Sequence, residues 1–402
     1  MNARRFALCA PLLAAVLAAG AGVPAFAQDG AQDGGETAEA PQYDYDWVLY
    51  YYMAYDNNLE ACGRPILDML EKGVTSERTV VLVSADFRDQ DGMRRYVLTQ
   101  GEEVETRLPD QEGSAEEETL ASELAWVGER FKAKKYAVVF LNHGGRLGEM
   151  SHDEHPGSEG GQNWLYPPDV APVLETFRKQ VPGEVELMFY QQCGKGTLEN
   201  VHAMKDTAKF IMASQTVVGA PNYYYTDAVK YVCEHPEIDG EELAKQFTER
   251  ETANMFTTYT TFDAAALADL PAKLAPVLAP LRAKDDVQAP NYRKLRLRPC
   301  FDMPPDEVMF DGFPLLAGLY QANGLDEAPL DAFKAWVKET LITSHRVSPD
   351  RMARASSWCG FSIYVPLSPA ALSRYAPTYP IYQQTELDEL WGSLLEQKAS
   401  KK

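Results

Sequence analysis

The chain has few positive charges, and this shortage excludes one large class of partners. Its 402 residues include 38 Lys and Arg against 59 Asp and Glu, for a formal net charge of −21. Binding to nucleic acid depends on clustered cations that release counterions from phosphates. One basic run lies at residues 293–298, and in so acidic a chain we interpret it as an internal salt-bridging surface. We therefore expect no nucleic acid among the partners.

Long uncharged apolar segments are also missing once the N-terminus is set aside. Arg4 and Arg5 precede an apolar stretch from Phe6 to Leu17, and Ala25-Phe26-Ala27 forms a small-x-small cleavage site. This order of segments is typical of a secretory signal peptide, and the apolar stretch is too short for a membrane anchor. No later stretch reaches about 18 apolar residues without a charge. We expect residues 1–27 to be removed and the protein to be exported, periplasmic or extracellular, with no membrane anchor.

Cysteines are scarce as well. Cys9 falls in the expected signal peptide, which leaves five in the mature chain: Cys62, Cys193, Cys233, Cys300 and Cys359. An odd number in an exported protein leaves at least one thiol outside any disulfide. The other four could form up to two disulfides in three pairings, or none, since reduced cysteines are often buried in cores. We nominate Cys193 as the thiol outside any disulfide, because it lies in a glycine-rich turn after an apolar run.

The composition divides the mature chain into three segments. Residues 28–45 are rich in Gly, Ala, Asp, Glu and Gln, and we expect a disordered leader there. Apolar runs alternate with helical stretches over residues 46–235, which predicts an α/β fold with a mainly parallel sheet flanked by helices. Residues 236–402 are predicted to be mostly helical and to pack on this core. Whether they form a separate domain or extend the same sheet stays open.

Two of the predicted strands end in reactive residues. The run from Tyr136 to Leu141 leads to His143 and two glycines, and the run that begins at Val185 leads to Cys193. Ligands bind beyond the carboxyl ends of strands in open α/β sheets, so the two side chains can meet in one cleft. A thiol with a free pKa of roughly 8.5 attacks only as thiolate, and a neighbouring imidazole can take its proton. The pattern predicts a cysteine nucleophile and its base.

The spacing and the glycines support this interpretation. His143 and Cys193 are 50 residues apart (193 − 143 = 50), and Gln-Gln-Cys-Gly-Lys-Gly partly matches the caspase signature, whose histidine lies about 50 residues upstream. The glycines let the backbone approach a substrate, so the amides of Gly144 and Cys193 are predicted to form an oxyanion hole. Either residue alone could be structural, but the pair at equivalent strand ends favours catalysis.

Five motifs, in this order, resemble the clostripain family of cysteine peptidases. They are Trp47 with Tyr-Met-Ala-Tyr-Asp-Asn-Asn-Leu-Glu up to residue 60, Leu-Asn-His-Gly-Gly, Cys193 with Leu-Glu at 198–199, Met-Ala-Ser up to Ser214, and the strand at 360–366. The resemblance spans about residues 46–396. It implies a caspase-like fold and an endopeptidase that acts on peptide or protein substrates. It also implies that His143 and Cys193 form the catalytic dyad and that no cofactor is required. Calcium activation and self-cleavage, described for the family, become expectations.

One position departs from that family. Members that cut after Arg or Lys carry an acidic residue two positions before the nucleophile, where this chain has Gln191. A neutral amide leaves a buried guanidinium uncompensated, so the P1 preference is expected to differ from Arg and Lys. Gln191 and Ser214 are the expected substrate-binding residues, although Gln191 as a packing residue stays open. The Gly-Lys-Gly-Thr stretch after Cys193 lacks the family's usual apolar residue, which puts the neighbouring pocket in doubt.

Two other functions stay open at this point. A catalytically inactive peptide-binding protein on the same fold is one, which Gln191 and the altered stretch after Cys193 favour. A zinc hydrolase that uses His143, His152 and His155 is the other, although zinc ligands usually occur in closer, recognisable pairs. The polar loop at residues 146–164, where two of these histidines lie, is long enough to be a functional or cleavable segment.

Overall fold

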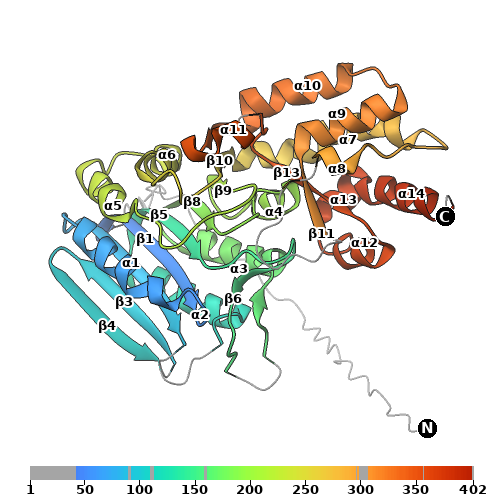
Figure 1. Cartoon of the computed structure of the whole chain (residues 1–402). Coiled ribbons are helices and arrows are strands. Elements are labelled where there is room, and N and C mark those ends of the chain that lie inside the picture. Colours follow the sequence, from blue (N-terminus) through green and yellow to red (C-terminus); the bar gives the residue numbers. More distant parts are fainter. Residues whose placement is uncertain are drawn as a thin grey trace, which may run out of the picture. The chain divides into compact units, whose positions relative to one another are not determined.

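Nine strands of the described residues form one sheet in the order β12-β10-β9-β8-β5-β1-β2-β3-β4 (Figure 1). The structure is a computed structural model, and it describes residues 42–88, 92–108, 113–157, 161–295, 297, 307–355 and 357–400. The strands are β1 (Tyr45–Tyr55), β2 (Thr79–Phe87), β3 (Met93–Thr99), β4 (Glu102–Leu108), β5 (Ala133–Leu141), β8 (Glu184–Gln191), β9 (Phe210–Ala213), β10 (Thr258–Asp263) and β12 (Ile342–Val347).

The centre of the sheet is parallel and its two edges are antiparallel. Strands β9, β8, β5, β1 and β2 run in one direction, while β3 and β4 form a hairpin beside β2. Every residue of β1 from Trp47 to Tyr55 is buried, as expected for a strand covered on both faces. The prediction of a mainly parallel sheet flanked by helices is confirmed.

Two hydrophobic clusters lie on the two faces of this sheet. Tyr50 and Tyr52 belong to one cluster, while Leu49 and Tyr51 belong to the other, because successive side chains of a strand point to opposite faces. Helices α1 (Glu60–Gly73), α5 (Tyr225–Glu234) and α6 (Gly240–Arg250) cover one face, and α2 (Glu117–Arg130), α3 (Pro167–Gln180) and α7 (Ala264–Arg282) cover the other (Figure 1).

The region beyond residue 236 extends the same sheet. Strand β10 pairs with β9, and β12 pairs with β10, both antiparallel. The sequence predicted residues 236–402 to be mostly helical, but α6 ends at Arg250 and a strand, β10, starts at Thr258, where threonines and aromatic residues favour a strand. The other elements here are α8 (Tyr292–Leu295), β11 (Glu307–Asp311), α9 (Gly312–Asn323), α10 (Ala328–Trp336), a π-helical turn (Val337–Leu341), a 3₁₀ turn (Pro349–Arg351), α11 (Met352–Ala355), β13 (Ser362–Pro366), α12 (Pro369–Tyr375), α13 (Pro380–Thr385) and α14 (Leu387–Ser400).

One helix of the described residues, α7, is long and apolar enough to cross a membrane by length and composition. It runs unbroken through three prolines, Pro271, Pro276 and Pro280, and it carries Asp269 and Lys273. Its leucines lie in the hydrophobic cluster that covers one face of the sheet. Core helices of globular proteins pass the same test of length and composition, and this packing is that of a core helix.

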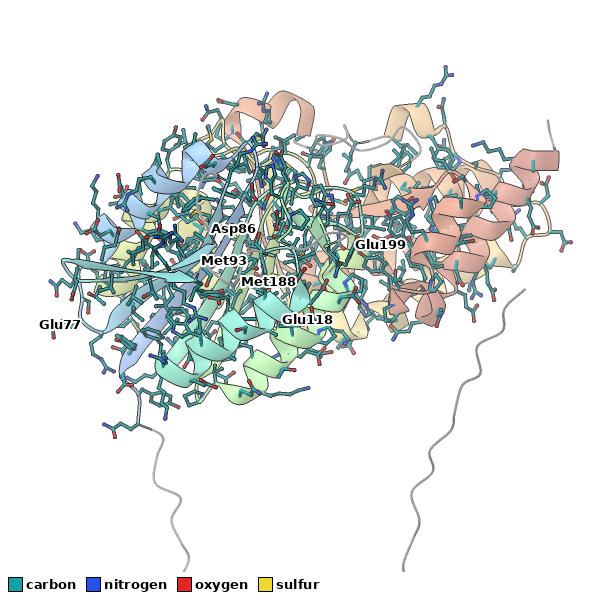
Figure 2. All side chains as sticks on the ribbon, turned by 90° about the horizontal axis from the view of Figure 1, so that it is seen from below. Glu77, Asp86, Met93, Glu118, Met188 and Glu199 are labelled. Carbon is teal, nitrogen blue, oxygen red and sulfur yellow. The ribbon has the colours of Figure 1, made fainter. Side chains whose placement is uncertain are left out.

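A buried carboxyl group joins the sheet to the C-terminal helices. Glu199 belongs to α4 (Leu198–Ala203), and its Oε1 accepts hydrogen bonds from the Tyr364 amide at 3.1 Å and the Tyr382 hydroxyl at 3.3 Å. Figure 2 shows Glu199 at the junction between these two parts of the chain. Burial raises the pKa of this carboxyl to about 7, since the charged form is poorly solvated.

This pKa predicts a pH-dependent stability. An unfolded glutamate has a pKa of 4.5, so between pH 4.5 and 7 the folded state keeps a proton that the unfolded state releases. The contribution of Glu199 is therefore fully present below pH 4.5 and is lost as the pH rises through 7, by up to about 3 kcal/mol. We expect Glu199→Gln to remove this component. In urea unfolding, the free energy of unfolding of the variant relative to the wild type should therefore be higher at pH 8 than at pH 4.5. A stability difference that is independent of pH would contradict this assignment.

Candidate active site

Two turns at the carboxyl edge of the sheet meet in direct contact. We call residues 142–145 the histidine turn and residues 192–197 the cysteine turn. Strand β5 pairs with β8 so that Leu141 lies opposite Gln191, and His143 and Cys193 each follow two positions later. A Cβ placed on Gly144 would lie 1.9 Å from the Cys193 carbonyl oxygen, which no real side chain tolerates. Glycine is therefore required here for the two turns to touch.

The Cys193 thiol is half-buried against the chain around Val218. Its Sγ donates to the Val218 carbonyl and accepts from the Val218 amide, both at 3.3 Å. Gly194 has φ of +68°, which suits glycine, and its amide donates to the Thr216 carbonyl at 2.8 Å. Helix α4 begins only at Leu198, beyond the cysteine turn, and a helix dipole fades within the first turn, so the dipole of α4 does not act on the thiol. Cys62, Cys193, Cys233 and Cys359 form no disulfide among the described residues, and Cys300 lies outside them.

The imidazole of His143 is held by a residue that the sequence reasoning did not single out. Its Nε2 lies 2.6 Å from Oδ1 of Asn58, just beyond the end of β1. An amide oxygen only accepts, so Nε2 carries the hydrogen and Nδ1 keeps a lone pair. The ring of His152 lies 6.4 Å from that of His143 and stacks on Trp164. Asn58 could have been suspected from the sequence, because it ends the polar motif Asp-Asn-Asn that directly follows β1. This geometry leaves Nδ1 as the atom that can take a proton.

Gln191 lies in a closed polar cluster. Its Nε2 donates to Asn222 Oδ1 and to the Tyr225 hydroxyl, and its Oε1 accepts from the Tyr224 hydroxyl. Asn222 in turn donates to Glu251 Oε2 at 2.6 Å, and burial raises the pKa of Glu251. The amide oxygen of Gln191, the atom that could accept from a guanidinium, already accepts from Tyr224, and the amide carries no negative charge.

Ser214 lies beneath the cysteine turn and is fully buried. Its carbonyl accepts from the Gly196 amide at 2.7 Å, and its hydroxyl accepts from the Thr216 amide at 3.3 Å. Two large apolar side chains in the segment that follows Ser214 are exposed instead: Val217, next to the Val218 that bonds the thiol, at 45%, and Tyr223 at 49%. The exposure of Val217 could not be predicted, because Thr-Val-Val-Gly at residues 216–219 resembles the end of a buried strand.

Three buried carboxylates lie close together near the end of β1. The ligand atoms of Asp56, Asp86 and Asp153 are all within 4.8 Å of one another, and oxygen ligands of this kind suit calcium. His155 Nδ1 lies 2.7 Å from Asp56 Oδ1. Within the part of the chain that the structure describes, this is the one such group of potential metal ligands, and it does not include the three histidines considered for zinc.

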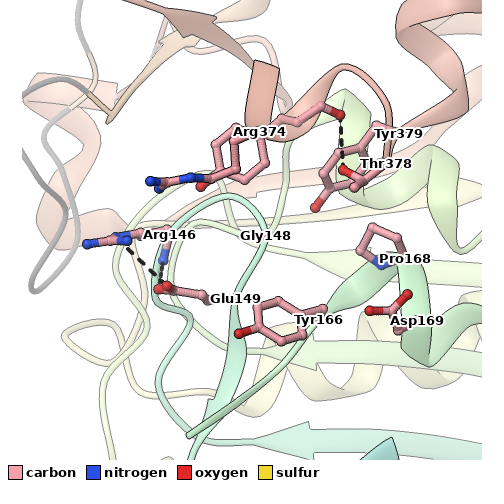
Figure 3. Close-up of a pocket in the computed structure, with 10 residues that line it drawn as sticks. Arg146, Gly148, Glu149, Tyr166, Pro168, Asp169, Arg374, Thr378 and Tyr379 are labelled. Carbon is pink, nitrogen blue, oxygen red and sulfur yellow. Dashed lines mark hydrogen bonds and ion pairs between the residues drawn. The ribbon is translucent and has the colours of Figure 1, made fainter. Parts of the chain in front are cut away.

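A pocket of about 400 Å³ lies beside the chain that follows the histidine turn. It is lined by Arg146, Gly148, Glu149, Tyr166, Pro168, Asp169, Arg374, Tyr375, Thr378 and Tyr379. Figure 3 shows Arg146 and Arg374 pointing to the same side of the pocket, away from Asp169. Short strands β6 (Met150–His152) and β7 (Trp164–Leu165) connect this region to α3. The C-terminal helices thus contribute one wall of a cavity next to the histidine turn.

The cysteine turn and the histidine turn are in contact at the edge of a mainly parallel sheet. This arrangement is that of the cysteine hydrolases with a caspase-like fold. The sequence matches the clostripain family over residues 51–283, more than half of the chain. The chain therefore belongs to the clostripain family and is a cysteine peptidase. A comparison with curated proteins gives no match.

Solved structures of C11 proteases share this fold. An inactive zymogen C11 protease from Parabacteroides distasonis superposes with a TM-score of 0.67 at 18% identity, covering 86% of this chain and 99% of that chain. A secreted C11 cysteine protease from Bacteroides thetaiotaomicron, in complex with an irreversible peptide inhibitor, gives 0.62 at 15% identity, covering 85% and 99%. A second structure of a secreted C11 protease from that organism, iotapain, gives 0.60 at 15%, covering 88% and 100%.

The contact at Gly144 yields a testable prediction. Gly144→Ala forces the two turns apart, so we expect kcat/KM on a peptide substrate to fall by at least about 100-fold, because a displacement of one ångström is this costly to catalysis. Gly392→Ala is the matched control, since it has open space in α14 and should stabilise the protein by about 0.5–1 kcal/mol. Activity of Gly144→Ala equal to that of the control would show that the turns need not touch.

Proposed function

We propose that the protein is an exported cysteine endopeptidase that uses a dyad of His143 and Cys193. The contact between Gly144 and the Cys193 backbone is the observation that supports this proposal, because it brings together the two turns that carry His143 and Cys193. Membership of a cysteine peptidase family supports the same reaction. Substrates are proteins or peptides.

The proposed chemistry follows from the side chains present. His143 Nδ1 takes the thiol proton while Asn58 holds Nε2–H, and the thiolate attacks the scissile carbonyl carbon. The amides of Gly144 and Cys193 then stabilise the oxyanion of the tetrahedral intermediate. Its collapse breaks the C–N bond, His143 gives its proton to the leaving amine, and a thioester remains. Water, deprotonated by His143, attacks the thioester and releases the acid and the thiol.

No cofactor is required for this sequence of steps, and calcium is proposed only as an activator. The carboxylates of Asp56, Asp86 and Asp153 are the described group that could hold such an ion. Self-cleavage within residues 146–164 is proposed on the basis of the length and polarity of that loop, of which residues 158–160 lie outside the described residues.

Export and chain organisation are part of the proposal. Residues 1–27 are proposed as a signal peptide and 28–45 as a leader; residues 1–41 lie outside the described residues, and β1 begins at Tyr45. We propose residues 46–235 as the catalytic core and 236–402 as the C-terminal region. Two of the structurally similar proteases are described as secreted, which supports export.

We further propose that P1 is neither Arg nor Lys. Gln191 is neutral, and its amide is saturated by Asn222 and two tyrosines. Exposed Val217, next to the Val218 that bonds the thiol, offers an apolar contact for a substrate side chain. Ser214 supports the floor of this site through its bond to Gly196.

Removal of the thiol tests the dyad. Cys193→Ala is expected to abolish peptide hydrolysis while the unfolding temperature stays nearly unchanged, because the loss is chemical. Iodoacetamide should inactivate the wild type in the same assay. Each protein is assayed with EDTA and with added calcium, and equal activity in both conditions removes the proposed calcium activation. Full activity of Cys193→Ala would remove the proposed mechanism, and no hydrolysis by either protein would favour a peptide-binding role.

Profiling on a diverse peptide library tests the specificity. The wild type is expected to cleave after residues other than Arg and Lys, and Gln191→Asp should raise cleavage after these two if Gln191 lines the P1 pocket. Gln192→Asp is the control, because this neighbouring buried glutamine bonds Ser151 instead. An unchanged profile in Gln191→Asp would assign Gln191 a purely structural role, and wild-type cleavage after Arg or Lys would contradict the proposed preference.

A further inference from the structure

A buried lysine connects the two turns of the site. Lys195 lies two residues after Cys193 and is fully buried. Its Nζ donates to the carbonyls of Arg146, at 2.7 Å, and Leu147, at 3.3 Å, and to the carbonyl of Glu149. A buried ammonium group is strongly unfavourable unless it is hydrogen-bonded, so these carbonyls are what permits its burial. All three of these carbonyls belong to one short loop, residues 146–149.

This loop, residues 146–149, which we call the carbonyl loop, follows the histidine turn directly. The Ser151 amide donates back to the His143 carbonyl at 3.1 Å, so the loop closes onto His143. The Leu147 carbonyl also accepts from Asn200 Nδ2 and from the Tyr379 hydroxyl, both at 3.1 Å. The loop is therefore fixed from the cysteine turn, from α4 and from the C-terminal region at once.

We propose that Lys195 is a positioning residue, whose ammonium group holds the carbonyl loop, and with it His143, at the separation from Cys193 that proton transfer needs. The inference rests on the proposed His143/Cys193 dyad. Lys195 lies in the Gly-Lys-Gly-Thr stretch after Cys193, which lacks the apolar residue usual in the family. An apolar side chain at position 195 would have no donors for the three carbonyls.

A purely structural role would have a different signature. Loss of a buried hydrogen-bonded cation lowers the stability of any protein, wherever the cation lies. A displaced His143 lowers kcat with little change in KM, because proton transfer is affected while substrate contacts remain. The split between kcat and KM therefore separates positioning from stability.

The test compares variants of the full chain. Lys195→Met keeps the length of the side chain and removes the donors, and we expect kcat to fall by about 10- to 100-fold with KM within about two-fold. Lys195→Arg keeps a cation and its donors and should recover at least about a tenth of the wild-type kcat. Lys209→Met is the matched control: Lys209 bonds buried Glu186 near the opposite end of β8, so its loss should lower the unfolding temperature and leave kcat unchanged.

The outcomes are distinguishable. Wild-type kcat in Lys195→Met, or an equal loss of kcat in Lys209→Met, overturns the positioning role. If Lys195→Met does not fold, Tyr379→Phe is the second test, because it removes the hydroxyl that bonds the Leu147 carbonyl and Asn200 Oδ1. This variant should lower kcat by about two- to five-fold with KM unchanged, and an unaltered kcat in it overturns the role equally. Activity of Cys193→Ala in the same assay would instead remove the dyad on which the inference rests.

Discussion

The site depends on one backbone contact, in which Gly144 lies against Cys193. This contact follows from the parallel register of β5 and β8, which places Leu141 opposite Gln191 and lets both chains leave the sheet at the same level. A side chain at position 144 would collide with the Cys193 carbonyl. Without this contact the turns that carry His143 and Cys193 would leave the same edge of the sheet but remain apart, and the proposed oxyanion hole would lose the amide of Gly144.

The C-terminal region is bonded to the site through buried polar groups. Glu199 accepts from Tyr364 and Tyr382, and Tyr379 donates to the Leu147 carbonyl beside the histidine turn. Buried polar groups require partners, so these bonds constrain the geometry more specifically than apolar packing does. Strands β10 and β12 complete the same sheet, so the two halves of the chain form one structural unit around the catalytic edge.

The sequence predicted the strands and turns that carry His143 and Cys193, because apolar runs ended by glycines are local signals. It failed where the partners are distant. Gln191 meets Asn222 and Tyr225, 31 and 34 residues further on, and Lys195 meets carbonyls 46 to 49 residues away. Helix was predicted where β10 forms, because pairing with β9 decides the state of that segment. No pattern in one sequence reveals such contacts.

The rate of Cys193 alkylation by iodoacetamide as a function of pH tests the central claim most directly, when the wild type is compared with His143→Ala. The thiolate is the reacting form, and a free thiol reaches it only near pH 8.5. If His143 takes the proton of Cys193, the wild type should react rapidly at pH 6–7 and the variant only at higher pH. Identical pH profiles in the two proteins would show that these residues do not share a proton.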